Sequence, residues 1–440
     1  MKKILILGAG LVCKPGAQYL LQQGYTVTVA SRTTAKAEKI VQGYENGTAL
    51  HLLVEDQKAL DAMVRENDII VSLLPYIHHV KVARTCLKYS KFLATTSYVS
   101  EEMRRLDDDV RSKNLLFLNE IGIDPGVDHM SAMRIIDAIH AQGGTVRHFY
   151  SFCGGLPAPD DNDNPFGYKF SWSPRGVVLA SRNPARFLEN GEVVNITGQD
   201  LFLNKRIETV DPLGEFEVYP NRDSLPYQEI YGLKDARTVM RGTYRNVGWC
   251  DTLKKIVDLG LVDESPVSYP AGTTFKAMLA GLVGVDESGD VAAAAAQKLG
   301  LEKEHFVIEN LTWLGLFGSD PVPACESKLD ILSERMLEKL QYQAGEKDML
   351  ILRHRFEVEN QDKSTQTITS TLIDYGIPHG DSSMARTVSL PLAVGITLMA
   401  ENKIDLTGVQ IPIVKELYQP VLEGIEALGV KMVEETIAHG

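Results

Sequence analysis

Cysteine is scarce in this chain, and no long hydrophobic run is present. The five cysteines among 440 residues are scattered, and no two of them form a Cys-x-x-Cys pair. This usage argues against a disulfide framework and a zinc site, so we expect no metal ligands. The best apolar stretch, 388–400, is interrupted by four residues and falls short of the roughly 18 apolar residues of a membrane span. The N-terminal apolar stretch is also too short for a signal peptide, so we expect a cytoplasmic protein without a membrane partner.

Basic residues are outnumbered as well. The 45 Lys and Arg stand against 58 Asp and Glu, which gives a net charge of −13. A chain this acidic is a poor match for nucleic acid, because it lacks a general basic face. An anionic small molecule is not excluded, since a few local arginines can reverse the potential inside a cleft. At about 150 residues per domain, the length predicts two or three domains.

The N-terminal part of the chain alternates apolar strands with helices. We predict strands over 3–7, 26–30, 68–74, 92–96 and 115–119, and helices over 11–23, 34–41, 78–89 and 101–113. Such alternation with short connections predicts an α/β fold, with a parallel sheet and right-handed crossovers.

The composition changes after residue 126. Residues 150–230 contain runs rich in Pro, Gly, Asn and Asp, for which we expect long irregular segments that carry function. Residues 250–345 have a largely helical pattern, which includes the alanine-rich stretch 291–299. The last part of the chain predicts strands over 348–358 and 366–374 and helices over 381–401 and 412–428.

A glycine-rich turn, Gly8-Ala9-Gly10, lies between the first predicted strand and helix. The two glycines allow a tight turn and let the backbone approach a pyrophosphate at the helix N-terminus. Cys13 takes the third position, where glycine or alanine is usual. The place of this turn in the chain favours a dinucleotide site over an ordinary β–α connection.

The end of the second predicted strand indicates which dinucleotide is bound. An NAD-selective site usually has Asp or Glu there, to accept from the ribose 2′-hydroxyl. This chain has Ser31-Arg32-Thr33, and a guanidinium flanked by hydroxyls suits the 2′-phosphate of NADP(H). NADP(H) is therefore favoured, and NAD(H) remains possible if Arg32 is an idle surface residue.

Several long motifs resemble the saccharopine dehydrogenase family, of the type that forms L-glutamate and is also called saccharopine reductase. The resemblance runs essentially from end to end. The motifs are 119–129 (NEIGIDPGVDH), 151–159 (SFCGGLPAP), 163–174 (DNPFGYKFSWSP), 219–224 (YPNRDS), 241–245 (RGTYR), 312–316 (TWLGL), 345–349 (GEKDM) and 383–388 (SMARTV).

The resemblance implies an NADP(H)-dependent oxidoreductase that acts on a CH–NH group. Such enzymes interconvert saccharopine with L-glutamate and 2-aminoadipate 6-semialdehyde in lysine metabolism, by imine formation and hydride transfer. It also implies a Rossmann domain, a second α/β domain that has a mixed sheet, binds the substrate and forms a homodimer, and a small helical insert. The corresponding ranges here are 1–128, completed by C-terminal helices at about 385–440; 129–245 with 320–384; and 246–319.

The resemblance also implies roles for individual residues. The cofactor-binding positions are Gly8, Gly10, Leu11, Val12, Ser31, Arg32, Thr33, Val54, Leu74, Thr95, Thr96, Ile123 and Pro125. The substrate-binding positions are Ser97, Tyr98, Asp124, Arg222, Thr243, Tyr244 and Arg245. The candidate catalytic residues are Asp124, Tyr98 and Cys153.

The chemistry of these residue types fits the implied substrate. Saccharopine has three carboxylates, and Arg222 and Arg245 offer planar, permanently charged donors for them. Asp124 follows a strand end, where its carboxylate can orient the substrate amine or accept from it, although a helix cap is the alternative. Cys153 can line the nicotinamide pocket, and no covalent thiol role is expected. Tyr98 is a possible acid, but the general acid is not identified.

For two neighbouring residues, we expect a structural role and not a catalytic one. Asp128 is the better candidate for the cap of a helix that starts at His129, and His129 is then expected to be structural.

Two alternative functions remain at this point. One is a related reductive-amination enzyme such as carboxynorspermidine dehydrogenase, which joins an aldehyde to an amine. The other is a non-catalytic dinucleotide sensor, which predicts the loss of the substrate arginines or of the Asp-Pro-Gly segment. Arg222, Arg245 and Asp124 are all present, which favours an enzyme.

Overall fold

The computed structural model describes residues 2–439. Its contacts divide the chain into two compact units. The first unit combines Met1–Thr145 with Val358–Gly440, and the second is Val146–Glu357. The three-part division expected from the sequence, with a separate helical insert, stays a prediction.

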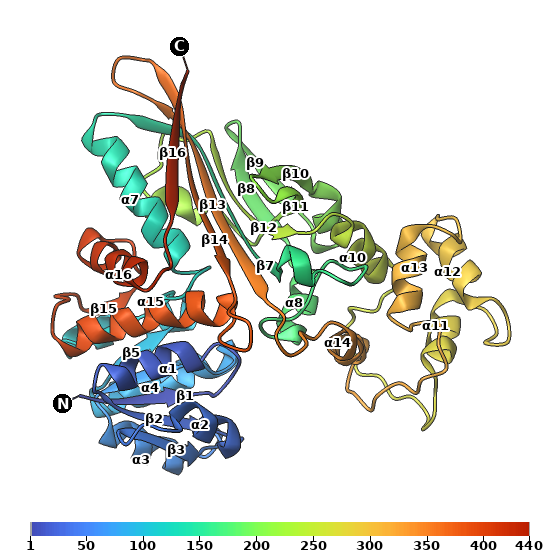
Figure 1. Cartoon of the computed structure of the whole chain (residues 1–440), viewed down its shortest axis with the longest axis horizontal. Helices are drawn as coiled ribbons and strands as arrows, with labels where there is room; N and C mark the ends of the chain where they lie inside the picture. The colour runs from blue at the N-terminus through green and yellow to red at the C-terminus, as the bar shows by residue number, and fades with distance from the viewer. Residues whose placement is uncertain (1, 440) are drawn as a thin grey trace. The chain divides into compact units, whose positions relative to one another are not determined.

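The first unit is built on a seven-stranded parallel sheet (Figure 1). The order is β15-β6-β5-β4-β1-β2-β3. The strands are β1 (Lys3–Leu7), β2 (Thr26–Ser31), β3 (Gly47–His51), β4 (Ile69–Ser72), β5 (Phe92–Thr95), β6 (Leu116–Leu118) and β15 (Gly408–Gln410). Strand order reverses between β1 and β4, which is the switch point where such sheets bind ligands. The α/β prediction is confirmed, whereas β3 and β15 were not expected.

Helices cover both faces of this sheet, as its apolar strands require. They are α1 (Lys14–Gln22), α2 (Thr34–Val41), α3 (Gln57–Glu66), α4 (His79–Tyr89), α5 (Glu101–Arg104), α6 (Asp107–Ser112) and α15 (Ser383–Ala400). Two more helices of the first unit, α7 (Val127–Ala141) and α16 (Lys415–Ala427), pack against each other, and α16 also packs against α15. Leu5 and Leu7 pack with residues of α3 and α4 on one face, and Ile6 packs with α1 and α15 on the other.

The single helix expected over 101–113 is wrong, because two short helices occupy this segment. The first, α5, is capped by the Ser100 hydroxyl, which accepts from the Met103 N–H. The second, α6, starts with three aspartates, and carboxylates in a first turn stabilise a new N-terminus. Asp107 also accepts from the backbone N–H of Val409 at 2.6 Å, which ties α6 to β15.

Helix α15 is long and apolar enough to pass for a membrane span by length and composition. Its mean hydropathy is 1.3, but 72% of it is buried inside the fold. Figure 1 shows α15 lying alongside α1, with α16 next to it. The apolar surface of α15 is therefore buried against other helices, as it is in the core helix of a globular protein.

The second unit contains a mixed sheet with the strand order β10-β11-β12-β7-β13. The strands are β7 (Thr145–Pro157), β10 (Arg206–Val210), β11 (Gly214–Pro220), β12 (Thr238–Arg245) and β13 (Asp348–Glu359). A hairpin of β8 (Ala185–Glu189) and β9 (Glu192–Ile196) branches from β12. Strand β12 pairs in parallel with β7 and antiparallel with β11, which confirms the mixed sheet.

The irregular segments expected over 150–230 are largely wrong, since five strands lie wholly or partly in this range. The glycines that suggested a loop lie inside β7. A Cβ on Gly154 would stand 2.6 Å from the Tyr244 carbonyl oxygen of β12. Glycine is needed there for the close approach of two strands and not for a turn.

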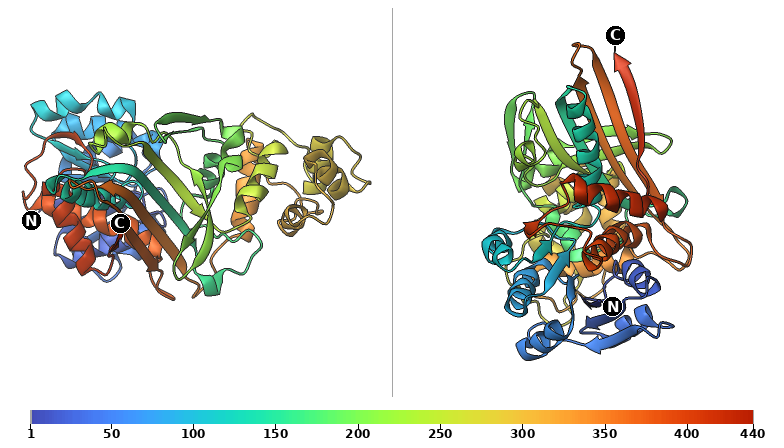
Figure 2. Two further views of the ribbon diagram at one scale, coloured as in Figure 1. Left: turned by 90° about the horizontal axis from the view of Figure 1, so that it is seen from above. Right: turned by 90° about the vertical axis from the view of Figure 1, so that its left-hand side faces the viewer.

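The second unit also contains helices. They are α8 (Pro174–Ala180), α9 (Pro226–Ile230), α10 (Trp249–Asp258), α11 (Phe275–Val283), α12 (Val291–Leu299), α13 (Phe306–Trp313) and α14 (Lys328–Lys339). The helical pattern predicted for 250–345 is confirmed, and α12 is the alanine-rich stretch. Figure 2 shows α11 to α13, in yellow, gathered together.

Two further strands belong to the first unit. Strand β14 (Thr365–Tyr375) pairs antiparallel with β16 (Val433–His439). The sequence predicted β14 but not β16.

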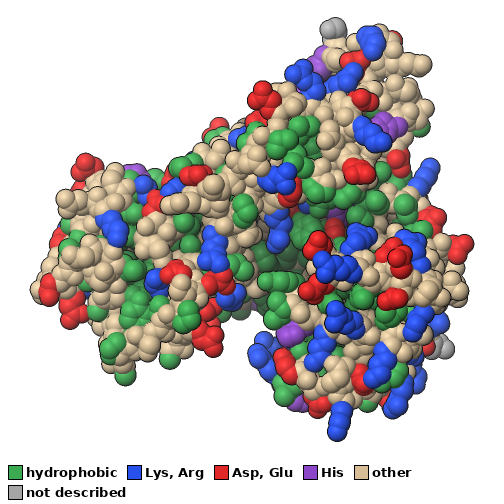
Figure 3. Space-filling model, turned by 180° about the vertical axis from the view of Figure 1, so that it is seen from behind, with side chains coloured by type: hydrophobic (Ala, Val, Ile, Leu, Met, Phe, Trp, Pro, Cys, Tyr) green, Lys and Arg blue, Asp and Glu red, His purple; other side chains and the backbone are tan. Residues whose placement is uncertain are grey.

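On the face shown in Figure 3, acidic and basic side chains are interspersed over the surface.

Candidate active site

The turn between β1 and α1 has the geometry of a dinucleotide loop. Gly8 has a φ of 110°, and a Cβ there would lie 2.7 Å from the Leu73 carbonyl oxygen, so only glycine fits. A Cβ on Gly10 would meet nothing within 4 Å, which leaves open space above the turn. The N-cap residue Cys13 makes no side-chain hydrogen bond to the start of α1. Pro15 has no N–H and the Gly16 N–H donates to Ser389, so within residues 2–439 the Lys14 amide is the first-turn donor left for an anion. These residues fit the pyrophosphate of a dinucleotide.

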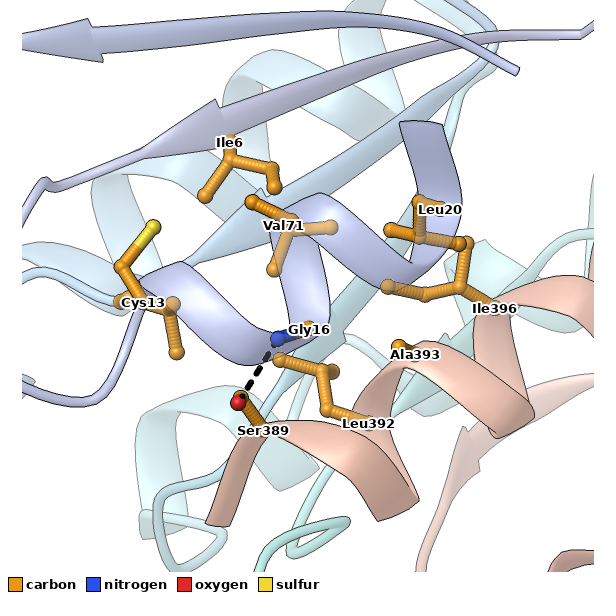
Figure 4. Close-up of a pocket in the computed structure, with 11 residues that line it drawn as sticks. Ile6, Cys13, Gly16, Leu20, Val71, Ser389, Leu392, Ala393 and Ile396 are labelled. Atoms are coloured by element: carbon orange, nitrogen blue, oxygen red, sulfur yellow. Dashed lines mark hydrogen bonds between the residues drawn. The ribbon is translucent and has the colours of Figure 1, made fainter. Parts of the chain in front are cut away.

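Cys13 is part of the packing behind this turn. It is 1% exposed, and burial raises the pKa of its thiol to about 12, so the thiol stays neutral. The close helix contact comes instead from Gly16, whose N–H donates to the Ser389 hydroxyl at 2.9 Å. Figure 4 shows this bond between α1 and α15. A Cβ on Gly16 would stand 2.5 Å from the Ser389 carbonyl oxygen. Gly16, three residues after Cys13, therefore allows the close helix contact that the third small residue of the glycine turn usually provides.

Arg32 lies directly after β2 and is exposed. Within residues 2–439, it forms no ion pair with a carboxylate. Thr33 donates its N–H to the Ser31 hydroxyl at 3.3 Å, which fixes the turn. An uncommitted guanidinium beside two hydroxyls matches the donors that a 2′-phosphate needs.

The other predicted cofactor positions lie near the carboxyl ends of the strands, around the same edge of the sheet. Val54 follows β3, Leu74 follows β4, Thr95 ends β5 and Thr96 comes directly after it. Ile123 and Pro125 come after β6 and are buried, while Leu11 and Val12 complete the glycine turn. The structure brings these residues to one edge, and their individual contacts with a cofactor stay predictions.

A buried histidine organises the ends of β4 and β5. His79 accepts or donates on both sides, with Ser72 Oγ 2.8 Å from its Nδ1 and Ser97 Oγ 2.8 Å from its Nε2. Burial lowers the pKa of His79 to about 4, with a smaller contribution from His78, so the ring is neutral near pH 7. His79 therefore holds the Ser97 hydroxyl in place. Sequence reasoning missed it, since it reads as the first residue of an ordinary helix.

We expect acidification to destabilise the protein partly through His79. Its pKa lies at about 4 in the folded chain against 6.5 for the free side chain, so only the unfolded chain binds a proton in this range. The stability is complete above about pH 6.5 and is lost as the pH falls through the folded pKa, by up to about 3 kcal/mol.

Denaturant unfolding of the wild type and His79→Asn, at about pH 7 and about pH 4.5, measures this contribution. The wild type is expected to lose more free energy of unfolding than the variant between the two pH values. An equal loss in both proteins would contradict the role of His79.

The segment 97–99 is held from its other side by Glu120. This residue is buried, and its Oε1 accepts from the Val99 N–H at 2.9 Å while its own N–H donates to the Ser97 carbonyl at 3.2 Å. Its Oε2 lies 2.8 Å from Nε2 of the buried His129. His129 is fully buried in this pair, and the expectation that it is structural stays a prediction. Glu120 was missed, because nothing in its local sequence marks a buried carboxylate.

Tyr98 and Asp124 are brought together in the first unit. The Tyr98 hydroxyl donates to Oδ1 of Asp124 at 2.8 Å, and both side chains are half-buried. The pair can bind a polar group and hold a proton at the tyrosine oxygen. The expected cap needs a correction: α7 begins at Val127, so Asp128 is a helical residue, and its carboxylate reaches back to the Gly126 N–H at 2.5 Å.

In the second unit, strand register aligns three of the predicted residues. Thr243 of β12 is paired with Cys153 of β7 on one side and with Tyr219 of β11 on the other. Since side chains alternate along a strand, Arg245 shares the face of Thr243, and Tyr244 lies on the opposite face. Tyr244 packs there against Phe152 and Phe216, so only its backbone remains a candidate ligand group on the Thr243 face. The role of Cys153, which is 8% exposed, stays a prediction.

Arg245 is a buried cation without an ion partner. It is 4% exposed, and its guanidinium carbon lies 4.9, 5.4 and 5.9 Å from the ring centres of Tyr168, Trp249 and Tyr219. Its Nη1 donates to the Tyr244 carbonyl at 2.8 Å, and its Nε has no hydrogen-bond partner. In the described range 2–439, no carboxylate pairs with it. An unpaired buried charge is costly, so the arrangement is suited to bind an anion.

Arg222 differs from Arg245 in its surroundings. It follows β11, is exposed, and has a left-handed φ of 57°. Its carbonyl accepts from the Arg186 N–H at 2.9 Å. Its role as a substrate ligand stays a prediction.

These features define the class of protein. A Rossmann-type sheet with a glycine turn, an uncapped first helix and hydroxyls at the strand ends is typical of a nicotinamide-dinucleotide-dependent oxidoreductase. Residues 4–118 match the saccharopine dehydrogenase NADP binding domain, and residues 122–430 match the saccharopine dehydrogenase C-terminal domain. The chain belongs to the saccharopine dehydrogenase family.

Individual relatives extend over the whole chain. It is 40% identical to "Saccharopine dehydrogenase [NADP(+), L-glutamate-forming]" of Schizosaccharomyces pombe, over 99% of both chains. It is 39% identical to the mitochondrial alpha-aminoadipic semialdehyde synthase of Bos taurus, over 98% of this chain and 47% of that protein. The structure of apo saccharopine dehydrogenase (L-Glu forming) from Saccharomyces cerevisiae superimposes with a TM-score of 0.90, at 35% identity and full coverage of both chains.

Proposed function

We propose that this protein is an NADP(H)-dependent, L-glutamate-forming saccharopine dehydrogenase of lysine metabolism. It interconverts saccharopine with L-glutamate and 2-aminoadipate 6-semialdehyde. The observation that carries the proposal is Arg245, a buried guanidinium that has no carboxylate partner among residues 2–439 and so suits a substrate with several carboxylates. The NADP binding domain matched by residues 4–118 and the uncommitted Arg32 support the cofactor.

The chain's own residues supply binding and proton handling. NADP(H), when bound, supplies or accepts the hydride at the carbon of the C–N bond. Arg245 and Arg222 bind carboxylates of the substrate. Asp124, which accepts from Tyr98, takes up the proton of the substrate amine as the C–N bond is oxidised, and the pair returns it in reduction. Water then adds to the imine and releases L-glutamate and the aldehyde.

The direct test is NADPH oxidation with L-glutamate and 2-aminoadipate 6-semialdehyde, and NADP+ reduction with saccharopine. The aldehyde–amine pair of carboxynorspermidine dehydrogenase is the parallel assay for the competing enzyme. The family match and the named relatives favour the first pair. No turnover of saccharopine in either direction would overturn the proposal.

We expect Arg32→Asp to shift the cofactor preference towards NADH. The exchange removes the guanidinium that faces the 2′-phosphate and puts an acceptor for the ribose hydroxyl in its place. The loss for NADPH is expected to be about 1.5–3 kcal/mol, or roughly 10- to 100-fold in KM. KM values for NADPH and NADH measure the shift, and Arg65→Asp, on α3, is a surface control. Unchanged selectivity would count against the role of Arg32.

The assembly and location of the protein belong to the same proposal. It acts in the cytoplasm as a homodimer, with small molecules as its other partners and no nucleic acid or membrane. Strand β16 supports a dimer, because Val433 and Ile437 on it are each 59% exposed. Light scattering after size exclusion tests the state of the wild type, and a monomeric mass would contradict the dimer.

A further inference from the structure

A buried ion-pair cluster in the second unit lies beside the proposed carboxylate site. Glu217 of β11 is fully buried, and its Oε1 lies 2.5 Å from Nζ of Lys205. Its Oε2 accepts from the backbone N–H of Cys250, in the first turn of α10, at 2.8 Å. The Lys205 ammonium also pairs with the more exposed Asp251, at 2.8 Å. Both oxygens of Glu217 are therefore engaged by groups outside β12.

Glu217 would otherwise be the natural partner of Arg245. The two residues are directly paired across the antiparallel strands β11 and β12. Residues in such positions bring their Cβ atoms to about 5 Å from each other, and opposite charges there attract. Yet in the part of the chain that the structure describes, residues 2–439, no ion pair joins them. Lys205 and α10 thus compete with Arg245 for the same carboxylate.

Unpaired donors surround the Arg245 guanidinium. The Arg245 Nε, the indole nitrogen of Trp249 and the hydroxyl of Tyr168 are buried and make no hydrogen bond within the described residues 2–439. Trp249 is 2% exposed and Tyr168 is fully buried, and their ring centres are 4.7 Å apart. Both rings also flank the guanidinium. Buried donors without partners are rare and costly, and the two oxygens of one carboxylate can satisfy all three.

We propose that Lys205 is a positioning residue that holds Glu217 and so keeps Arg245 open for a substrate carboxylate, which Arg245 binds together with Trp249 and Tyr168. The naming of saccharopine as the ligand rests on the proposed function. The ligand class, a compound with at least one carboxylate, follows from the three buried donors at Arg245, Trp249 and Tyr168.

The charge state of Lys205 suits this role. Burial lowers the pKa of its ammonium, but the hydrogen bonds to Asp251 and Glu217 raise it by more, so the net pKa lies above the ordinary value. The ammonium therefore stays charged at neutral pH, and the hold on Glu217 does not depend on small changes of pH.

Lys205→Met tests the proposal, because it releases Glu217 towards Arg245. We expect the KM for saccharopine to rise about tenfold, since an intramolecular carboxylate now competes with the substrate, while kcat changes less than about twofold. Lys205→Arg keeps a cation and is expected to behave like the wild type. The double variant Lys205→Met/Glu217→Gln removes the competitor and is expected to return KM to within about threefold of the wild type.

Thermal unfolding separates this role from a structural one. If Lys205 only stabilised the fold, Lys205→Met would lower Tm and leave KM at the wild-type value. A KM for Lys205→Met equal to that of the wild type would overturn the proposal, and so would a double variant that is no better than the single one. Trp249→Phe keeps the ring and loses only the N–H, and is expected to raise KM about fivefold with kcat retained.

A binding measurement separates this inference from the proposed function. Calorimetric titration of the chain with saccharopine, and with glutarate as a simple dicarboxylate, needs no turnover. If saccharopine is not turned over but glutarate binds, with weakening in Lys205→Met and recovery in the double variant, the proposed function fails and the carboxylate site stands. If neither compound binds the wild type, the carboxylate site is overturned.

Discussion

Arg245→Met is expected to weaken saccharopine binding severely without destabilising the protein. The variant loses a buried donor for a carboxylate, which costs about 2–5 kcal/mol, or a rise in KM of roughly 30- to several-thousand-fold. Its stability is expected to be equal to or above that of the wild type, because an unpaired buried charge is replaced by an apolar side chain of similar volume. Steady-state kinetics and thermal unfolding measure the two effects.

A second buried arginine provides the control. Arg335 on α14 is 5% exposed, like Arg245, but it is fully paired. It binds Asp320 and Glu338 at 2.7 Å each, and the Leu314 carbonyl at 2.7 Å. Arg335→Met is therefore expected to lower the free energy of unfolding by about 1–3 kcal/mol, and Tm with it. Its KM is expected to be unchanged. An Arg245→Met protein that unfolds more easily than Arg335→Met, with normal KM, would refute the assignment.

Asp124→Asn is expected to lower kcat by roughly 10²- to 10⁴-fold, the usual loss when a general acid–base group is removed. The amide keeps the size of the carboxylate and can still accept from Tyr98, so the fold is expected to be retained. It cannot take up the proton of the substrate amine. Rates with saccharopine and NADP+ at saturation, together with their pH profile, measure the change.

Two companion variants interpret that result. Tyr98→Phe removes the hydroxyl that donates to Asp124, and a smaller fall in kcat is expected if Asp124 itself handles the proton. Asp128→Asn is the matched control, since its carboxylate is occupied at the start of α7 by the Gly126 N–H. An Asp124→Asn enzyme with more than about half of the wild-type kcat would rule out the acid–base role.

The cofactor half of the site was largely predictable from the sequence. Gly8 and Gly10 follow an apolar strand and precede a helix, and this local order is enough to predict a pyrophosphate turn. The cofactor role of Arg32 could be predicted for the same reason, because one helix and one strand fix its distance from the turn along the chain. The residues that support the site could not be predicted from the sequence. His79 and Glu120 hold the segment 97–99 only because β4, β5 and α7 meet there.

Glycine and proline content misled the sequence analysis in the second unit. The run Gly154-Gly155-Leu156-Pro157 suggested a loop, but it completes β7. The reason is tertiary, since the glycine makes room for the Tyr244 backbone of β12. Likewise, β15 is too short to be recognised by its own pattern, and it forms by pairing with β6 from almost 300 residues earlier.

The sequence by itself determined the α/β class, the dinucleotide turn, the favoured cofactor and, through its motifs, the family. These depend on residues close together in the chain, whose spacing sets the local backbone. The role of Cys13 became clear only in the fold, where it packs between α1 and α15 and remains an unreactive thiol. Tertiary structure alone decided which arginine is left without a partner. Arg245 and Arg335 are equally buried, and they differ in pairing because pairing depends on strand register and on distant side chains such as Lys205 and Glu217.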